Sequence, residues 1–186
     1  MGLAVAAISD QHRAFIEAQH LFFVATAPSG DDGHVNLSPK GYDTLVVRGP
    51  NEVAYLDLTG SGAETIAHLR QNGRITFLFC AFEGKPNLLR LHGHGQVVAP
   101  GEAEFIELAG LFPSHRGARA VIVVEVDRVS TSCGYSVPFM SFEGDRPTLD
   151  EWVARKSEDD LVEYRATKNA TSIDGLPSIG SDELAG

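Results

Sequence analysis

One stretch, residues 53–82 (VAYLDLTGSGAETIAHLRQNGRITFLFCAF), constrains the fold most, because two strands, a helix and their links can be read from it. Residues 53–58 are apolar and β-prone, which predicts a strand. Residues 63–71 carry apolar side chains at helical spacing, and an Asn-Gly pair then supplies a stop. Residues 74–82 predict a second strand that is apolar on both faces and therefore buried.

The loop between the first strand and the helix is Thr59-Gly60-Ser61-Gly62. Hydroxyls, glycine backbone and the positive end of a helix dipole together favour the binding of a phosphate group. The same sequence is also typical of an ordinary turn followed by a helix cap, so the residues alone leave both interpretations open. Lys40 raises a similar choice between a cleft residue and a solvated surface lysine.

The remaining segments predict mostly strands joined by short turns. A helix is expected over residues 9–18, with Ser9 or Asp10 as its cap. Pro39 cannot donate to a β-ladder, so its strand ends there or lies at a sheet edge. The further strands are expected over residues 21–27, 34–38, 45–48, 88–98 and 118–126. About seven strands and few helices favour an antiparallel barrel over a doubly wound parallel sheet.

The chain after residue 130 differs in character from the β-rich part. It begins with a loop, and Thr148 with Glu151 has the spacing of a capping box for a helix that breaks near Ser157 and then continues to about Lys168. The last fifteen or so residues look extended or frayed. We therefore expect a barrel over residues 1–130, and a loop and helical extension over residues 131–186 that packs on the same domain.

Charge and composition exclude several classes of function. The net charge of −10 argues against a broad surface for nucleic acid or anionic membranes. No stretch is long and apolar enough for a membrane span, and the first fifteen residues lack the pattern of a signal peptide, so a cytoplasmic location is expected. Cys80 and Cys133 are too few and too far apart for a metal knuckle, and Cys80 in its apolar strand is expected to be a buried thiol.

Two histidines on one predicted strand raise the question of a metal. His92 and His94 are spaced so that both lie on one face, but no third ligand stands at suggestive spacing and Arg90 on that face would repel a cation. We expect no metal, and a polar face that contacts a ligand or a partner instead. Nucleophile elbows, Walker loops and Gly-x-Gly-x-x-Gly motifs are also missing, and we assign no catalytic residue.

Taken together, these segments resemble the pyridoxamine 5′-phosphate oxidase-like family of flavin-binding split barrels. The resemblance covers roughly residues 8–179 and is closest to the bacterial branch that carries the Ser-Pro-Lys-Gly and Thr-Gly-Ser-Gly elements, rather than to the vitamin-forming oxidase. The matching motifs are FFVATA (22–27), HVNLSPKG (34–41), the whole of residues 53–82, LLRLHGHGQVV (88–98), SCGYSVPFM (132–140), DEWVARK (150–156) and KNATSIDGLPSI (168–179).

The resemblance implies a mainly β fold with flanking helices: a six-stranded antiparallel split β-barrel, which forms a homodimer with FMN in the groove between subunits. The vitamin-forming enzymes place a basic pair where this chain has Glu64-Thr65, and their residues for pyridoxal phosphate have no clear counterpart here. Pyridoxamine-phosphate oxidation is therefore not expected. By motif match, the cofactor-binding residues are Asn36, Leu37, Ser38, Lys40, Asp57, Leu58, Thr59, Gly60, Ser61, Glu64 and Thr65.

The function that this resemblance implies is an FMN-dependent oxidoreductase that exchanges a hydride or electrons with a small molecule. A deazaflavin-dependent reductase and a flavin- or haem-binding module without turnover are the alternatives. Tyr135 is as compatible with a packed aromatic as with a residue that stacks on a ring. The candidates on the substrate side are Arg90, His92, Cys133 and Tyr135.

Overall fold

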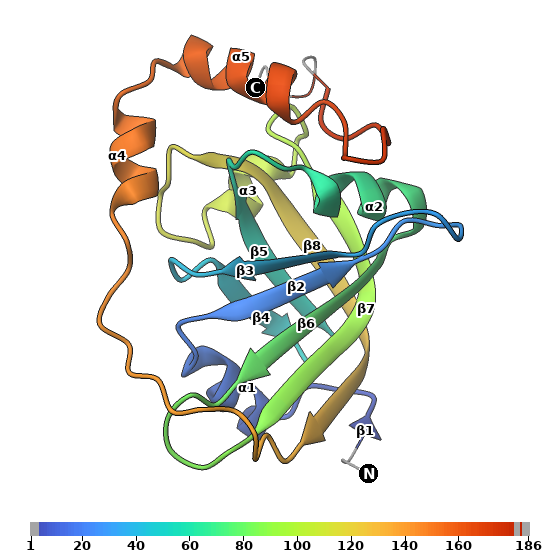
Figure 1. Cartoon of the computed structure of the whole chain (residues 1–186), viewed down its shortest axis with the longest axis vertical. Helices are drawn as coiled ribbons and strands as arrows, with labels where there is room; N and C mark the ends of the chain where they lie inside the picture. Colours follow the sequence, from blue (N-terminus) through green and yellow to red (C-terminus); the bar gives the residue numbers. More distant parts are fainter. Residues whose placement is uncertain (1–3, 181–182, 184–186) are drawn as a thin grey trace.

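An antiparallel sheet of eight strands forms the centre of the computed structural model, which describes residues 4–180 and residue 183 (Figure 1). The strands follow one another across the sheet in the order β3-β2-β6-β7-β8-β5-β4, and β1 pairs with β8. The strands are β1 (Ala4–Val5), β2 (Phe22–Thr26), β3 (Asn36–Lys40), β4 (Leu45–Gly49), β5 (Glu52–Leu58), β6 (Arg74–Cys80), β7 (Leu88–Val98) and β8 (Ala118–Ser132).

All of the strand pairs are antiparallel, as predicted, and the sheet is strongly curved without closing, since β3 and β4 end it as open edges. The mainly β split-barrel class is thus confirmed. The sheet has two strands more than the six expected, and the two-residue β1 is one that the pattern did not indicate. Pro39 lies within β3, and its missing N–H is tolerated because β3 is an edge strand.

The described residues form five helices, and Figure 1 shows none of them in front of the strands β2, β6 and β7. Ser9 caps the first helix through a reciprocal pair with His12, and Gly73 ends the second in the left-handed conformation at φ 72°. The helices are α1 (Asp10–Glu17), α2 (Glu64–Asn72), α3 (Phe105–Ala109), α4 (Thr148–Ala154) and α5 (Glu158–Lys168). None of the helices among the described residues is long and apolar enough to cross a bilayer.

The main core fills the inside of the curved sheet. Period-2 alternation directs Phe22, Val24, Phe77, Phe79 and their neighbours on the other strands inward, where they are buried. The outward residues of β6 are only half-buried, so the prediction that this strand is buried on both faces is wrong. Its outward residues include Arg74, Thr76 and Leu78, and no helix of the described residues covers them in Figure 1.

Two predictions for the C-terminal part also need correction. Thr148 is the first helical residue of α4 rather than its cap, and the capping box lies instead at Ser157 and Asp160, at the start of α5. The last fifteen or so residues are predicted to be extended or frayed. Residues 172–180 are not frayed, because Ser178 and Ile179 are buried against the rest of the chain. Residues 181–182 and 184–186 lie outside the described residues.

Candidate functional site

A pocket of about 290 Å³ lies where β3, the end of β5 and the beginning of α2 meet. Three polar side chains of β3 face it because alternate residues of a strand share one face. The pocket is lined by Asn36, Ser38, Pro39, Lys40, Leu58, Gly60, Gly62, Glu64, Thr65 and Arg119.

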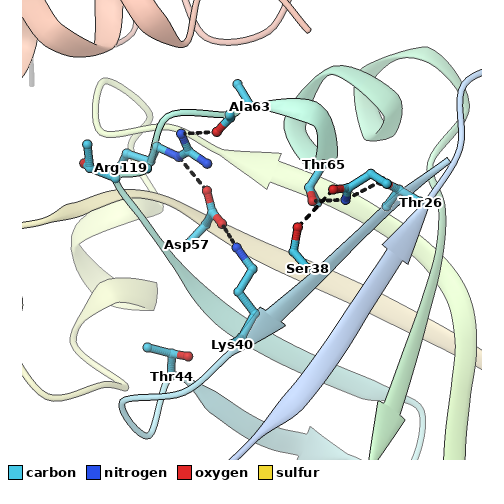
Figure 2. A network of polar contacts seen from close by, with 12 residues as sticks. Thr26, Ser38, Lys40, Thr44, Asp57, Ala63, Thr65 and Arg119 are labelled. Atoms are coloured by element: carbon cyan, nitrogen blue, oxygen red, sulfur yellow. Dashed lines mark hydrogen bonds and ion pairs between the residues drawn. The ribbon is translucent and has the colours of Figure 1, made fainter. Parts of the chain in front are cut away.

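A buried ion triad lies at this pocket (Figure 2). The carboxylate of Asp57 is fully buried, and its two oxygens accept from Lys40 Nζ at 2.8 Å and from Arg119 Nε at 2.7 Å. Arg119 also donates through Nη1 to the carbonyl oxygen of Gly62 at 2.8 Å. The guanidinium therefore ties the ion triad to the loop that precedes α2.

A β-bulge explains how Arg119 reaches this position. Asp57 pairs with Ala120 and Leu58 pairs with Ala118, so Arg119 is an extra residue of β8 without a partner in the ladder. A bulge of this kind re-aims the side chain at the insertion, and such bulges are common beside functional sites. Arg119 can thus turn toward Asp57 rather than into the apolar cluster that β5 and β8 form with α3.

The triad carries one net positive charge. Burial raises the pKa of the Asp57 carboxyl, but the charges of Arg119 and Lys40 outweigh this effect and lower the pKa to about 2. Asp57 is therefore ionised at neutral pH and neutralises one of the two cations. The remaining positive charge favours an anionic ligand in the pocket.

A chain of hydrogen bonds orients the polar residues of β3 (Figure 2). Asn36 Nδ2 donates to Thr65 Oγ1 at 3.0 Å and to Thr26 Oγ1 at 3.2 Å, while Asn36 Oδ1 accepts from Ser38 Oγ at 2.9 Å. Thr26 Oγ1 lies 2.9 Å from Nδ1 of the fully buried His68, which is consistent with Thr26 donating to a neutral imidazole. Burial lowers the pKa of His68 and supports that neutral form. Thr65 Oγ1 accepts from Asn36, which leaves the Thr65 O–H to donate either to the neighbouring Tyr55 or to a ligand.

The beginning of α2 lacks a side-chain cap. Ala63 occupies the cap position and supplies no hydrogen bond, so the amide groups of the first turn have no capping side chain. Glu64 lines the pocket as well, but one of its carboxylate oxygens accepts from the backbone N–H of Ile173 at 3.0 Å. A helix end beside the net positive charge of the triad suits a phosphate group. Glu64 is the one acidic residue on the pocket wall, and its carboxylate opposes a phosphate.

Most of the predicted cofactor residues line this pocket, and four of them lie elsewhere. Asp57 lies below it in the ion triad, and the Thr59 hydroxyl is used within the protein, where it donates to Gly117 O at 2.8 Å. Ser61 is exposed on the loop. Leu37 lies on the opposite face of β3 and is 64% exposed.

The predicted substrate residues do not join this pocket within one chain. Arg90 and His92 lie on the outer face of β7, where Arg90 donates to Ser132 Oγ at 3.2 Å and His92 Nδ1 is 3.1 Å from Thr76 Oγ1. Cys133 and Tyr135 are exposed in the segment after β8. Among residues 4–180 and 183, no three His, Cys, Asp or Glu side chains form a group that could hold a metal ion.

A larger pocket of about 490 Å³ lies elsewhere, between the start of β2 and residues 140–142. Its walls are mostly apolar, and His20 stacks on Phe142 there with ring centroids 3.8 Å apart. It has no buried ion group comparable to the triad, so we place the candidate site in the smaller, charged pocket.

Sequence reasoning missed Arg119, His68 and Thr26. The signal for Arg119 was a basic residue in the strand ARAVIVVEV, which is otherwise almost entirely apolar. His68 and Thr26 carried no comparable signal, because each fits the apolar periodicity of its own element.

Comparison with known proteins identifies the family of the chain. The sequence model of the pyridoxamine 5′-phosphate oxidase family matches residues 8–133. The chain therefore belongs to this family. It is 39% identical over 194 residues to the pyridoxamine 5′-phosphate oxidase family protein ustO of Aspergillus flavus, and the match covers 94% of this chain and 76% of the fungal protein.

Solved structures share the fold at low sequence identity. A putative pyridoxamine 5′-phosphate oxidase from Lactobacillus delbrueckii has a TM-score of 0.54 at 15% identity, with 69% of this chain and 97% of that chain covered. HupZ of Group A Streptococcus has a TM-score of 0.53 at 21% identity, with 72% and 99% covered. At these identities the likeness concerns the fold alone.

Proposed function

We propose that this protein binds FMN, with the flavin phosphate in the pocket between β3 and the beginning of α2. The single observation that carries the proposal is the pairing of an uncapped helix end with the positively charged triad of Lys40, Asp57 and Arg119. A Cβ at Gly60 would meet no heavy atom within 4 Å, so the backbone of this loop is open to a ligand. The residues present thus fit a phosphate monoester.

When bound, FMN would supply the chemistry of hydride or electron transfer. The chain's own residues bind and orient it: Lys40 and Arg119 offset the phosphate charge, and the Thr65 hydroxyl can donate to a phosphate oxygen. Asn36 and Ser38 hold one another in fixed orientations on β3. No side chain at the pocket is assigned as an acid or base, and we propose an oxidoreductase that acts on a small molecule other than pyridoxamine phosphate.

The outer face of the sheet supports the proposal of a homodimer. Phe23 of β2, Leu37 of β3 and Leu78 of β6 point to this face and are half-buried or exposed in the single chain. Figure 1 shows no helix over this face. A second copy on this face would bury these side chains and bring Arg90 and His92 to the subunit interface.

The test is the visible spectrum of the purified protein, followed by titration of the apoprotein with FMN. We expect flavin absorption and one FMN per chain. Lys40→Met should weaken FMN binding at least about tenfold, since a charge-assisted hydrogen bond contributes about 1.5–3 kcal/mol. Lys85→Met, which removes an exposed lysine from the turn after β6, is the matched control and should bind like the wild type.

A colourless protein whose apo form takes up neither FMN nor a deazaflavin would refute the proposed cofactor class. Uptake of the deazaflavin alone would favour the reductase alternative. If FMN binds, reduction by NADH or NADPH and reoxidation by an acceptor separate an oxidoreductase from a flavin-binding module without turnover.

A further inference from the structure

The C-terminal part of the chain forms hydrogen bonds with the loop that precedes α2 and with the first residue of that helix. Residues more than a hundred positions apart in the sequence meet here, and Figure 1 shows α5 and the segment after it lying beside the start of α2. The hydrogen bonds are Arg165 Nε to Thr59 Oγ1 at 2.9 Å, Asn169 Nδ2 to Gly60 O at 2.9 Å, Ile173 N to Glu64 Oε2 at 3.0 Å and Ser178 Oγ to Ala63 O at 3.1 Å.

Arg165 is an unusual residue at this contact. Its side chain is buried, with 6% of the residue exposed, and no ion pair links it to any carboxylate among the described residues. Burial lowers its pKa, and the nearby charge of Arg119 lowers it further. The charge of Glu158 raises the pKa again, and Arg165 Nη2 donates to the carbonyl oxygen of Arg116 at 3.4 Å. A buried arginine without a direct ion pair is costly, so its polar contacts matter for the loop that they reach.

With the contact from Arg165, the hydroxyl of Thr59 both accepts and donates a hydrogen bond within the protein. Thr59 Oγ1 accepts from Arg165 and donates its only hydrogen to Gly117 O, which also accepts from the Thr59 backbone N–H at 2.7 Å. The first residue of the loop is thereby held from two sides.

Asn169 holds the next residue of the loop. It is fully buried at the end of α5, one helical turn after Arg165, whose carbonyl accepts from its N–H at 2.8 Å. The Asn169 amide donates to Gly60 O, while its own Oδ1 has no partner among the described residues. Consecutive loop residues are thus fixed by one turn of α5.

We propose that α5 positions the phosphate-binding loop, and that Arg165 and Asn169 are positioning residues for the phosphate of the flavin. The identity of the ligand in this inference rests on the proposed function. The contacts of α5 with the loop are observed independently of that function. It predicts a selective effect: loss of either contact weakens binding of FMN, whose phosphate needs the loop, and leaves riboflavin, which lacks that phosphate, nearly unaffected.

The experiment compares the apo forms of four variants with the wild type. Arg165→Gln and Thr59→Val break the same hydrogen bond from its two sides, and the second keeps the arginine charge. Asn169→Ala breaks the neighbouring contact. Lys168→Gln removes an exposed charge from the same helix and serves as the control. Titrations with FMN and with riboflavin are followed by flavin fluorescence, and hydrogen exchange of the amides of residues 60–63 is measured without ligand.

We expect the three contact variants to raise the Kd for FMN by at least about tenfold, or about 1.4 kcal/mol, and that for riboflavin by less than about twofold. Their loop amides should exchange faster than in the wild type, whereas Lys168→Gln should match the wild type in both assays. Where Arg165→Gln does not fold, Thr59→Val and Asn169→Ala decide.

Equal loss of affinity for both flavins, unchanged affinity for FMN or unchanged exchange of the loop amides would each overturn the positioning role. If the wild type binds neither flavin, the proposed cofactor fails on its own account. The exchange measurement then still decides whether α5 fixes the loop.

Discussion

Replacing Asp57 by asparagine tests the electrostatic core of the site. The carboxylate is fully buried and accepts from two cations, so Asp57→Asn leaves a site of nearly the same shape with two charges and no counter-ion. Removing one partner of a buried pair typically costs about 3–5 kcal/mol. The side chain of Lys40 is 19% exposed and can turn toward solvent, whereas that of Arg119 is 5% exposed and cannot.

One cation therefore relaxes and the other stays buried, which places the expected loss at the lower end, about 3 kcal/mol in the free energy of unfolding. For a chain of this size, that corresponds to a fall in Tm of roughly 6–12 °C. Thermal unfolding at pH 7 and urea titration measure the two quantities. Asp127→Asn is the matched control, because its carboxylate is 59% exposed and lies 3.7 Å from His94. It should change stability by less than about 0.5 kcal/mol.

The pH dependence gives this prediction a second readout. The pKa of Asp57 is lowered to about 2 from 3.8, so its stabilising effect is fully present above pH 3.8 and is lost as the pH falls toward 2. The gap between wild type and Asp57→Asn should therefore be constant from pH 7 to about 4.5 and narrow below that. A variant that unfolds within about 2 °C of the wild type at pH 7 would refute the reasoning, because less than about 1 kcal/mol would then separate them.

Three further predictions concern the fold around the site. Gly93→Ala should destabilise by about 2–3 kcal/mol in urea titrations, since a Cβ would lie 2.0 Å from the backbone oxygen of Glu125, whereas Gly49→Ala, with open space around it, should be tolerated. Burial lowers the pKa of His68 below 6.5, so the unfolded chain takes up a proton at a higher pH than the folded chain. The wild type should therefore lose stability relative to His68→Gln as the pH falls below 6.5. Parallel curves of Tm against pH for the two proteins would contradict this. Leu78→Asp on the outer face of β6 should convert the proposed dimer into a monomer in light scattering, and an unchanged mass would argue against that interface.

The sequence by itself determined the type and approximate position of most elements, with β1 as an exception. Alternation and helical spacing located β2, β5, α2, β6 and β7 within one or two residues, because each pattern reports on its own segment. The family resemblance, rather than the two motifs alone, predicted that the Ser38-Pro39-Lys40 and Thr59–Gly62 segments bind one ligand, and both segments contribute residues to the same pocket.

Only the tertiary structure decided how the charges are arranged. Arg119 reaches Asp57 through a one-residue bulge, and a period-2 pattern cannot show such a shift in register. The contact of Arg165 with Thr59 joins positions 106 residues apart, and no local signal distinguishes that arginine from its exposed neighbours on α5. Local patterns fix what each segment becomes. Which charged side chains lose their water and pair with one another depends on how the segments pack.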